Sequence, residues 1–497
     1  MNTATKLDGG NKHDGLAQLN LRVKHDLINL CYPGKDWVPQ FEDRSSKDYS
    51  DVVIIGAGMC GLAAYFALRR GGMRNIRILD RSPCGVEGPW LKYARMETLR
   101  SPKHLTGPAS GMASLTFQAW YRAQYGATAW DELDKIPREM WMDYLSWYRQ
   151  VLEIPVENET SVDEIVPEES GLRLLLSGDG ATSDFIQTRR VVLATGREGL
   201  AFPNIPDFIK ETPNNMWAHS AADIDFSALK GKRVVVIGIG ASAVDNAAEA
   251  LEAGAAEVRH LIRRAEMPRI NKMMGIGSFG FTAGFPALSE AWRWRLMHYA
   301  SNEQTPAPRG STLRVSRHSN AFFHFDASVS SIQETGPVLR ITTTSGAALT
   351  TDFIILGTGF IVEPIAEPSM RKFSKDIRLW RDVYAPPVGM ENDELGKFPD
   401  LRKDFSFQER THGAAPWLQR IHCFNFGATM SLGKVSGDIP AVSEGASWLA
   451  REVAARFYTE DIETHWRDLQ DYTTAELQGE EWTSSDLPED INQRHDQ

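Results

Sequence analysis

Apolar residues follow two spacings in alternation along the chain, and this pattern predicts an α/β fold. Residues 51–55 (DVVII) are mostly β-branched with little alternation, which is typical of a buried parallel strand. A helix is expected over 59–70, where a glycine pair ends it, and a second strand over 75–79. The three segments together form a βαβ unit.

A second βαβ unit begins near residue 232. Its strand is expected over 234–237, its alanine-rich helix over 241–253 and its next strand over 258–262. A further helix is expected over 138–152, where an aromatic stripe is typical of a core-facing side. Hairpin-like strands are expected over 161–166, 171–176, 328–334 and 338–344.

The uncharged run 52–68 is almost long enough to span a membrane. Three glycines interrupt it and Arg69 and Arg70 follow it, so a strand, a turn and a packed helix are expected instead. The polar N-terminus has no apolar core of the kind that signal peptides carry, and a cytoplasmic location is expected.

Each βαβ unit carries a glycine pattern between its first strand and its helix, where dinucleotide-binding folds hold a pyrophosphate. The first pattern is Gly56-Ala57-Gly58-Met59-Cys60-Gly61. Asp80, followed by Arg81, ends the next strand at the spacing expected for the acid of this motif. A carboxylate there accepts a ribose hydroxyl and repels a 2′-phosphate.

The second pattern is Gly238-Ile239-Gly240-Ala241-Ser242-Ala243, and the strand after its helix leads into Arg263 and Arg264. Arginine at that position suits the 2′-phosphate of NADP, although these two residues would also be ordinary as solvated surface charges. The two units therefore carry side chains of opposite charge at the end of their second strand. The acidic unit is expected to bind FAD and the basic one NADPH.

A third glycine pattern, GIGSFG at 275–280, does not follow a buried strand, and Pro286 interrupts the residues after it. We reject it as a nucleotide site. The loop 273–285 is expected to be either a mobile loop near the active site or an ordinary loop.

Two strands that end in Thr-Gly, within 191–196 and 353–360, predict a nested arrangement of two Rossmann-like dinucleotide-binding domains. The chain would leave the first domain after one strand and return to it at the other. The expected domains are an N-terminal extension (1–49), a discontinuous FAD-binding domain (50–199 and 325–458), an inserted NADPH-binding domain (200–324) and an acidic C-terminal tail (459–497).

Composition narrows the choice of partners. The 497 residues include 54 basic and 65 acidic ones, and the net charge of −11 argues against nucleic acid or an anionic membrane as the main partner. The four cysteines, Cys31, Cys60, Cys84 and Cys423, contain no CxxC pair. Their spacing argues against a disulfide framework, a metal cluster and thiol–disulfide chemistry.

With these motifs, the sequence over roughly 50–450 resembles the class B flavoprotein monooxygenases, a family with flavin-containing, Baeyer–Villiger and N-hydroxylating branches. METLRSPKHL at 96–105 looks most like the flavin-containing and N-hydroxylating branches. Four more segments are similar to family motifs (GGxW, GxSAx(D/E), ATG and ATGY): Gly88-Pro89-Trp90, GASAVD at 240–245, Thr195-Gly196 and Thr358-Gly359.

The Baeyer–Villiger branch fits less well. Only His219 of its FxGxxxHxxxW fingerprint is present, because Pro213, Asn215 and Asp223 occupy the other marked positions. Ester or lactone formation is therefore a minority expectation, and His219 suits a structural role as well as a functional one.

The resemblance also implies a reaction. NADPH reduces the flavin, oxygen adds as a C4a-hydroperoxide shielded by bound NADP, and a small nucleophile, first of all an amine, attacks the distal oxygen. This reaction requires no side-chain nucleophile, so the catalytic residues stay unassigned, with Lys103, His104 and His219 as candidates. Asp438, which precedes a predicted helix, is expected either to contact the flavin or only to cap that helix.

Other functions remain open beside N-oxygenation of an amine. They are sulfoxidation or Baeyer–Villiger oxygenation, an NADPH oxidase or flavin reductase that makes no oxygenated product, and a nucleotide-binding protein without turnover. The expected partners are a small-molecule substrate and O2, with a homo-oligomer as a further option.

Overall fold

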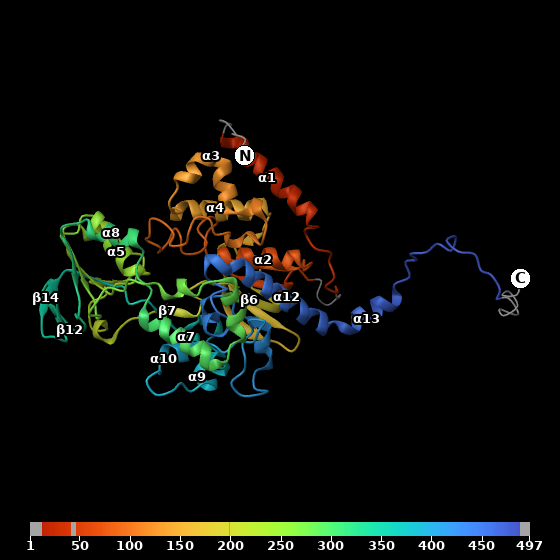
Figure 1. Cartoon of the computed structure of the whole chain (residues 1–497). Coiled ribbons are helices and arrows are strands. Elements are labelled where there is room, and N and C mark those ends of the chain that lie inside the picture. Colours follow the sequence, from red (N-terminus) through yellow and green to blue (C-terminus); the bar gives the residue numbers. More distant parts are fainter. Residues whose placement is uncertain (1–11, 41–45, 198, 488–497) are drawn as a thin grey trace, which may run out of the picture.

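The chain folds into two lobes that lie side by side, with a C-terminal segment extending outward from the larger one (Figure 1). This description comes from a computed structural model and covers residues 12–40, 46–197 and 199–487. Within those residues, we find no helix long and apolar enough to cross a membrane.

The larger lobe is built on a seven-stranded sheet in the order β3-β2-β1-β6-β5-β4, with β17 beside β6. Its first strand is buried along almost its whole length, which explains why DVVII does not alternate. The strands are β1 (Tyr49–Ile55), β2 (Ile76–Leu79), β3 (Val156–Glu157), β4 (Ser161–Pro167), β5 (Leu172–Ser177), β6 (Phe185–Leu193) and β17 (Ile421–His422). β4 and β5 form an antiparallel hairpin, as predicted.

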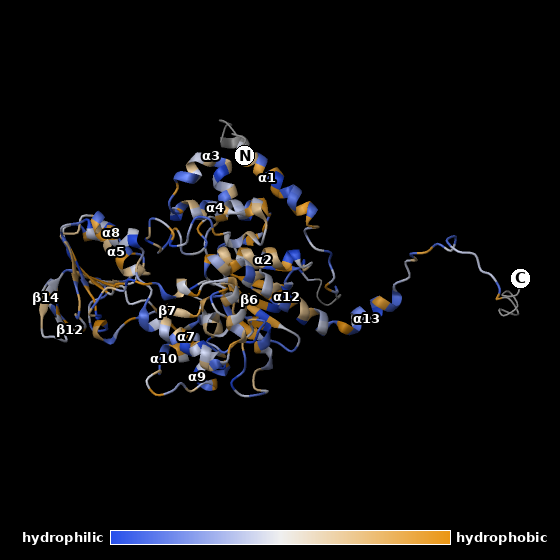
Figure 2. Ribbon diagram, viewed as in Figure 1, coloured by the Kyte–Doolittle hydropathy of each residue, from blue (hydrophilic) through white to orange (hydrophobic). Residues whose placement is uncertain are grey.

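Helix α2 (Met59–Arg70) follows β1 and packs against α12 (Val442–Glu460). Figure 2 shows hydrophobic residues gathered on α2 and β6, where this lobe is buried. The predicted aromatic stripe lies on α4 (Arg138–Val151) and belongs to the core, since Trp141 and Tyr144 are fully buried. The other helices of this lobe are α1 (Lys12–Asn29), α3 (Phe117–Glu132), α9 (Trp380–Val383), α10 (Asp393–Gly396), α11 (Thr429–Leu432) and α13 (Ile462–Asp471).

The smaller lobe has a five-stranded parallel sheet in the order β11-β10-β9-β15-β8, covered by α5. A three-stranded antiparallel sheet packs on it through Leu339 and Ile341. The elements of this lobe are β8 (Trp217–His219), β9 (Arg233–Ile237), α5 (Ala241–Glu252), β10 (Glu257–Leu261), α8 (Arg309–Ser316), β11 (Ala321–His324), β12 (Val329–Thr335), β13 (Val338–Thr343), β14 (Ala348–Thr351) and β15 (Phe353–Leu356). Helices α6 (Phe279–Gly284) and α7 (Glu290–Glu303) come from the same stretch of chain, but Trp294 of α7 belongs to the core of the larger lobe.

The predicted return to the first domain at residue 325 is wrong. β15 lies between β9 and β8, so the strands of 329–356 belong to the smaller lobe. The chain returns instead through β16 (Phe360–Val362), which pairs with the outgoing strand β7 (Ala201–Pro203). A hairpin pattern predicts strands but does not indicate which of two sheets they will pack on.

Candidate functional site

The first glycine turn leaves no room for side chains at two of its three positions. Gly56 has φ +101°, and a Cβ there would lie 2.7 Å from the Ala194 carbonyl oxygen. A Cβ on Gly61 would lie 1.8 Å from the Gly56 oxygen, so α2 packs directly on the turn. At Gly58, which precedes α2, the nearest atom is the Cα of Gly88 at 3.7 Å, and the helix N-terminus is open to a ligand. This arrangement fits a pyrophosphate.

Asp80 lies beside that turn at the end of β2. Its Oδ2 accepts the N–H of Ala57 and its Oδ1 the N–H of Ser82, each at 2.8 Å. The carboxylate is buried and retains further lone pairs for a ribose hydroxyl. Arg81, the next residue, is exposed.

Two more predicted segments border the turn. Gly88, with φ +79°, faces Gly58, while the Trp90 ring meets Trp141 edge-on at 6.3 Å. Thr195 and Gly196 follow β6, and Asn425 donates to the Thr195 hydroxyl at 3.1 Å. Sequence reasoning missed Asn425, because it lies 230 residues further along the chain and only folding brings it to Thr195.

The second glycine turn repeats the geometry with one exchange. Gly238 has φ +116°, and a Cβ on it would lie 2.5 Å from the oxygen of Gly357. Ala243 occupies the position of the third glycine of the motif. Its side chain has room because Gly357, directly after β15, has no Cβ; a Cβ on Gly357 would lie 2.3 Å from the Ala243 Cβ. Gly240 precedes α5, leaving Ala241 and Ser242 in the first turn of the helix.

His260 supports this turn from β10. Its Nδ1 lies 3.0 Å from the Gly238 carbonyl oxygen and its ring stacks on Phe323. Burial lowers the pKa of His260 to about 4, so the ring is neutral and Nδ1–H donates. The sequence offered no signal for this contact.

The two arginines after β10 have different surroundings. Arg264 is engaged: its Nε donates to Gln304 Oε1 and its Nη2 to the Asn302 carbonyl, both at 2.7 Å. Arg263 is exposed and makes no hydrogen bond or ion pair within the described residues. Arg263 is therefore the free cation next to the second turn.

The three catalytic candidates do not converge. The Lys103 ammonium donates to the Trp130 carbonyl at 2.6 Å and lies over that residue's ring. His104 is exposed. His219 Nε2 lies 2.9 Å from the Gly359 oxygen, after β15, and its Nδ1 accepts the Ala221 N–H, after β8, so the two nitrogens join the segments that follow these neighbouring strands.

Three further predicted positions lie after β15 and before the short helix 439–441 that leads into α12. The Thr358 hydroxyl donates to the Asn204 carbonyl at 2.5 Å, and Gly359 has φ +80°. Asp438 is half-exposed and pairs with Lys434 at 3.8 Å. Its side chain makes no capping hydrogen bond to the short helix that it precedes, as far as the described chain shows, which weighs against the capping alternative.

A cluster of charges lies where the lobes meet, and of its members sequence reasoning missed Arg100. Burial lowers the pKa of Arg100, an effect that the nearby carboxylates of Asp245 and Asp438 oppose. Arg100 Nη2 also donates to the Pro306 carbonyl at 2.8 Å, across the lobe junction. Asp245, on α5, is buried, and burial raises its pKa.

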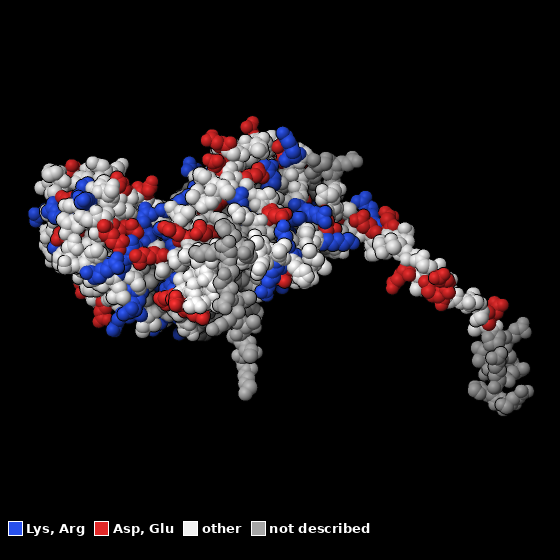
Figure 3. Space-filling model, turned by 90° about the horizontal axis from the view of Figure 1, so that it is seen from above, with Lys and Arg blue, Asp and Glu red and all other residues white. Residues whose placement is uncertain are grey.

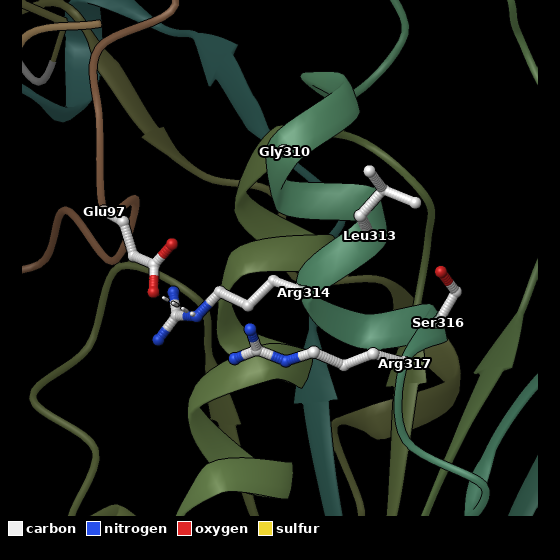
Figure 4. A pocket seen from close by; sticks show the side chains of 6 residues that line it. All are labelled: Glu97, Gly310, Leu313, Arg314, Ser316 and Arg317. Carbon is white, nitrogen blue, oxygen red and sulfur yellow. Dashed lines mark ion pairs between the residues drawn. The ribbon is translucent and has the colours of Figure 1, made fainter. Parts of the chain in front are cut away.

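Arg314 of α8 joins α5, the helix after the second glycine turn, to the larger lobe. It donates to Glu249 at 2.7 Å and to Glu252 at 2.8 Å on α5, and to the Arg95 carbonyl at 2.9 Å. Figure 4 shows it facing Glu97 of the larger lobe, with the ion pair at 3.6 Å. A pocket of about 290 Å³ opens beside this junction, lined by Glu97, Gly310, Leu313, Arg314, Ser316 and Arg317. None of its lining residues belongs to either glycine turn, and three of the six (Glu97, Arg314 and Arg317) form ion pairs.

The rejected third glycine pattern follows no strand in the structure, since 272–275 form a short helical turn and α6 comes next. Thiol–disulfide chemistry has no paired sulfurs here. All four cysteines are free; Cys60 donates to the Ser436 carbonyl and Cys423 to Asn425. Burial raises the pKa of Cys60 to about 12, which keeps it a thiol.

Comparison with known proteins agrees with this arrangement. A family model described as pyridine nucleotide-disulphide oxidoreductase matches residues 53–275. The FAD-dependent urate hydroxylase of Xanthomonas campestris pv. campestris is 36% identical over 467 residues, covering 94% of this chain and 98% of that protein.

Solved structures share the fold at low identity. The ornithine N-hydroxylase of Kutzneria sp. 744, in a structure with reduced FAD, NADP+ and L-ornithine, has a TM-score of 0.62 at 16% identity and covers 82% of this chain and 99% of that one. Bacillithiol disulfide reductase of Staphylococcus aureus has a TM-score of 0.55 at 16% identity, covering 82% and 99%. Oxygenases and reductases thus share this fold, and the fold alone does not decide the reaction.

Proposed function

Because the chain belongs to the family of the FAD-dependent urate hydroxylase, it is a flavin monooxygenase that uses FAD and NADPH, and we propose that it hydroxylates a small nitrogen-rich nucleophile, with urate as the first candidate. The relationship to the urate hydroxylase over almost the whole of both chains carries the choice of substrate. The pairing of Asp80 beside one glycine turn with a free Arg263 beside the other supports the assignment of the two cofactors.

In this proposal, Gly56 and Gly58 hold the pyrophosphate of FAD and Asp80 its ribose. Gly238 and Gly240 hold the pyrophosphate of NADPH, and Arg263 pairs with the 2′-phosphate of NADPH. When bound, FAD supplies the redox chemistry that links NADPH oxidation to oxygen transfer from O2. The residues of the chain bind and orient the two cofactors and exclude water between them, so no side-chain nucleophile is required.

The charges at the lobe junction support two substrate classes to different degrees. Arg100 suits an anionic oxopurine such as urate, and this agrees with the sequence relationship. Asp245 and Asp438 suit an ammonium group, and the shared fold of the ornithine N-hydroxylase supports N-hydroxylation of an amine as the second candidate.

The test is substrate-stimulated turnover of the FAD-loaded enzyme. NADPH oxidation, oxygen uptake and peroxide release are followed with urate, L-ornithine, an alkyl diamine and a thioether, each at the same concentration. We expect urate to raise oxygen uptake and to lower peroxide release, with one labelled oxygen atom entering the product under ¹⁸O2.

Each alternative predicts a different outcome. Stimulation by an amine with a hydroxylamine product would replace urate by the second candidate. Peroxide release equal to NADPH oxidation with every compound would identify an oxidase and overturn the proposal, as would a protein that binds no flavin.

A further inference from the structure

The C-terminal arm, defined as residues 462–487, begins with a helix whose apolar side is left uncovered by the part of the chain that the structure describes. On α13 the residues Ile462, Trp466 and Leu469 follow one another at helical spacing and are 47%, 54% and 66% exposed. The helix buries none of its residues and meets the body through His465, which stacks on Tyr458. A face of this kind is found where a partner covers it.

Beyond α13 the arm is extended and runs away from the body (Figure 1). It carries Tyr472, Leu477, Trp482 and Leu487, all more than half exposed. Residues 472–487 include four acidic side chains and no basic one. Figure 3 shows these acidic side chains along the arm, interspersed with uncharged ones. The arm is therefore an acidic segment with apolar and aromatic side chains at intervals.

A groove of complementary character lies on the outer side of α7. The inner side of this helix is fixed to the larger lobe, where Arg293 donates to the Ser431 carbonyl at 2.9 Å and Trp294 to that of Met390 at 2.8 Å. The outer side forms a groove of about 290 Å³, here called the α7 groove, lined by Trp292, Arg295, Leu296, His298, Tyr299 and Met390.

The α7 groove combines exposed aromatic rings with positive charge. Trp292 and Tyr299 are 52% and 50% exposed, and the Arg295 guanidinium lies 5.1 Å from the centre of the Trp292 ring. The lining contains no acidic residue. Over 267–299 the sequence has four basic residues and one acidic residue. Aromatic residues and arginine are the side chains most often found at the centre of protein interfaces.

We infer that the C-terminal arm of one copy binds the α7 groove of a second copy. The aromatic ring of Trp482 provides the anchor, and the adjacent Glu480 and Glu481 face Arg295 and His298. The arm leaves the larger lobe from the end of α12 and points outward, away from α7 of its own chain (Figure 1). A two-fold dimer in which both arms are exchanged satisfies both surfaces at once.

The first test measures the mass of the full-length, FAD-loaded protein in solution by light scattering over a range of concentrations. We expect a dimer for the unmodified chain. Trp482→Ala and Arg295→Glu should each weaken the dimer at least tenfold, whereas Leu21→Ala, which removes an apolar side chain that is 68% exposed on α1, should not. The double charge reversal Glu480→Arg and Glu481→Arg should restore the dimer in the Arg295→Glu background.

The second test asks which chain the arm contacts. Trp482→Cys and Tyr299→Cys are placed in separate chains, in a background in which the exposed Cys31 and Cys84 are serine. Mixing the two proteins should give a disulfide between different chains. A protein that stays monomeric, a dimer that none of the arm and groove variants weakens, or a disulfide that forms only when both cysteines are in one chain would each overturn the inference.

Discussion

Replacing Arg263 by alanine should remove most of the preference for NADPH over NADH. Arg263 and Arg264 are adjacent in sequence, but only Arg263 is without a partner in the described structure. A free guanidinium next to the second glycine turn suits a 2′-phosphate, which NADPH has and NADH lacks. The substitution therefore removes an interaction that NADH cannot make.

The expected effect follows from the strength of such contacts. A hydrogen bond to a charged group contributes about 1.5–3 kcal/mol, and solvent screening at an exposed site favours the lower end. One or two such bonds correspond to a rise of roughly 10- to 100-fold in the KM for NADPH, since about 1.4 kcal/mol is a factor of ten. The KM for NADH should change by less than about twofold.

Arg264→Ala should behave differently. Arg264 holds Gln304, whose amide lies 4.0 Å from the position of a Cβ on Gly240, so its loss should loosen the turn itself. We expect both cofactors to bind more weakly by a similar factor, about fivefold for about 1 kcal/mol.

The assay is anaerobic flavin reduction, with the rate measured against NADPH and NADH concentration. Arg269→Ala, at an exposed arginine in the following loop, serves as the matched control, and flavin content is checked in each variant. An unchanged ratio of the two KM values in Arg263→Ala, or equal losses for both cofactors, would refute the reasoning.

Three other predictions concern stability and cofactor retention. Gly61→Ala should release FAD, seen as loss of flavin absorbance on gel filtration, because a Cβ there would lie 1.8 Å from a backbone oxygen; Gly437→Ala, with no atom within 4 Å, should not. Arg314→Met should lower the free energy of unfolding in urea by about 2–3 kcal/mol because it leaves the partly buried Glu249 unpaired and removes one of the two arginines that pair with Glu252, whereas the mostly exposed Arg317→Met should cost at most about 1 kcal/mol. The pKa of His260 falls from 6.5 to about 4 on folding. The neutral ring therefore contributes fully to the free energy of unfolding above pH 6.5, and this contribution is lost as the pH falls toward 4. That loss amounts to about 3 kcal/mol in urea titrations and should be absent in His260→Gln.

Local signals explain what could be predicted from the sequence. The βαβ units, the glycine turns and Asp80 lie within short stretches whose geometry depends on neighbouring residues, and the structure has them where the patterns indicated. The strands of 329–356 were predicted in the wrong lobe. β12–β14 have an ordinary hairpin pattern, and the residues on which they pack, Val235 and Leu261, are remote in the sequence.

In the candidate site, too, contacts between residues remote in the sequence could not be predicted. The difference between Arg263 and Arg264 depends on Gln304 at the end of α7, and the position of Arg100 depends on Pro306. Neither partner has a sequence motif, because each contact is made by a loop that tertiary packing brings into place. Asn425, which meets Thr195, is missed for the same reason.

The pairing of β7 with β16 has a consequence for how such a protein arises. Phe360 lies opposite Pro203, so the chain enters and leaves the smaller lobe through neighbouring backbone positions. A host fold that accepts an insert at one surface point needs no rearrangement of its own strands, and an insert whose ends already meet loses little chain entropy on joining. The smaller lobe thus has both of its chain connections at one point. Exchange with the corresponding lobe of a relative needs two neighbouring splice points and a matching surface for α7, which packs on the larger lobe.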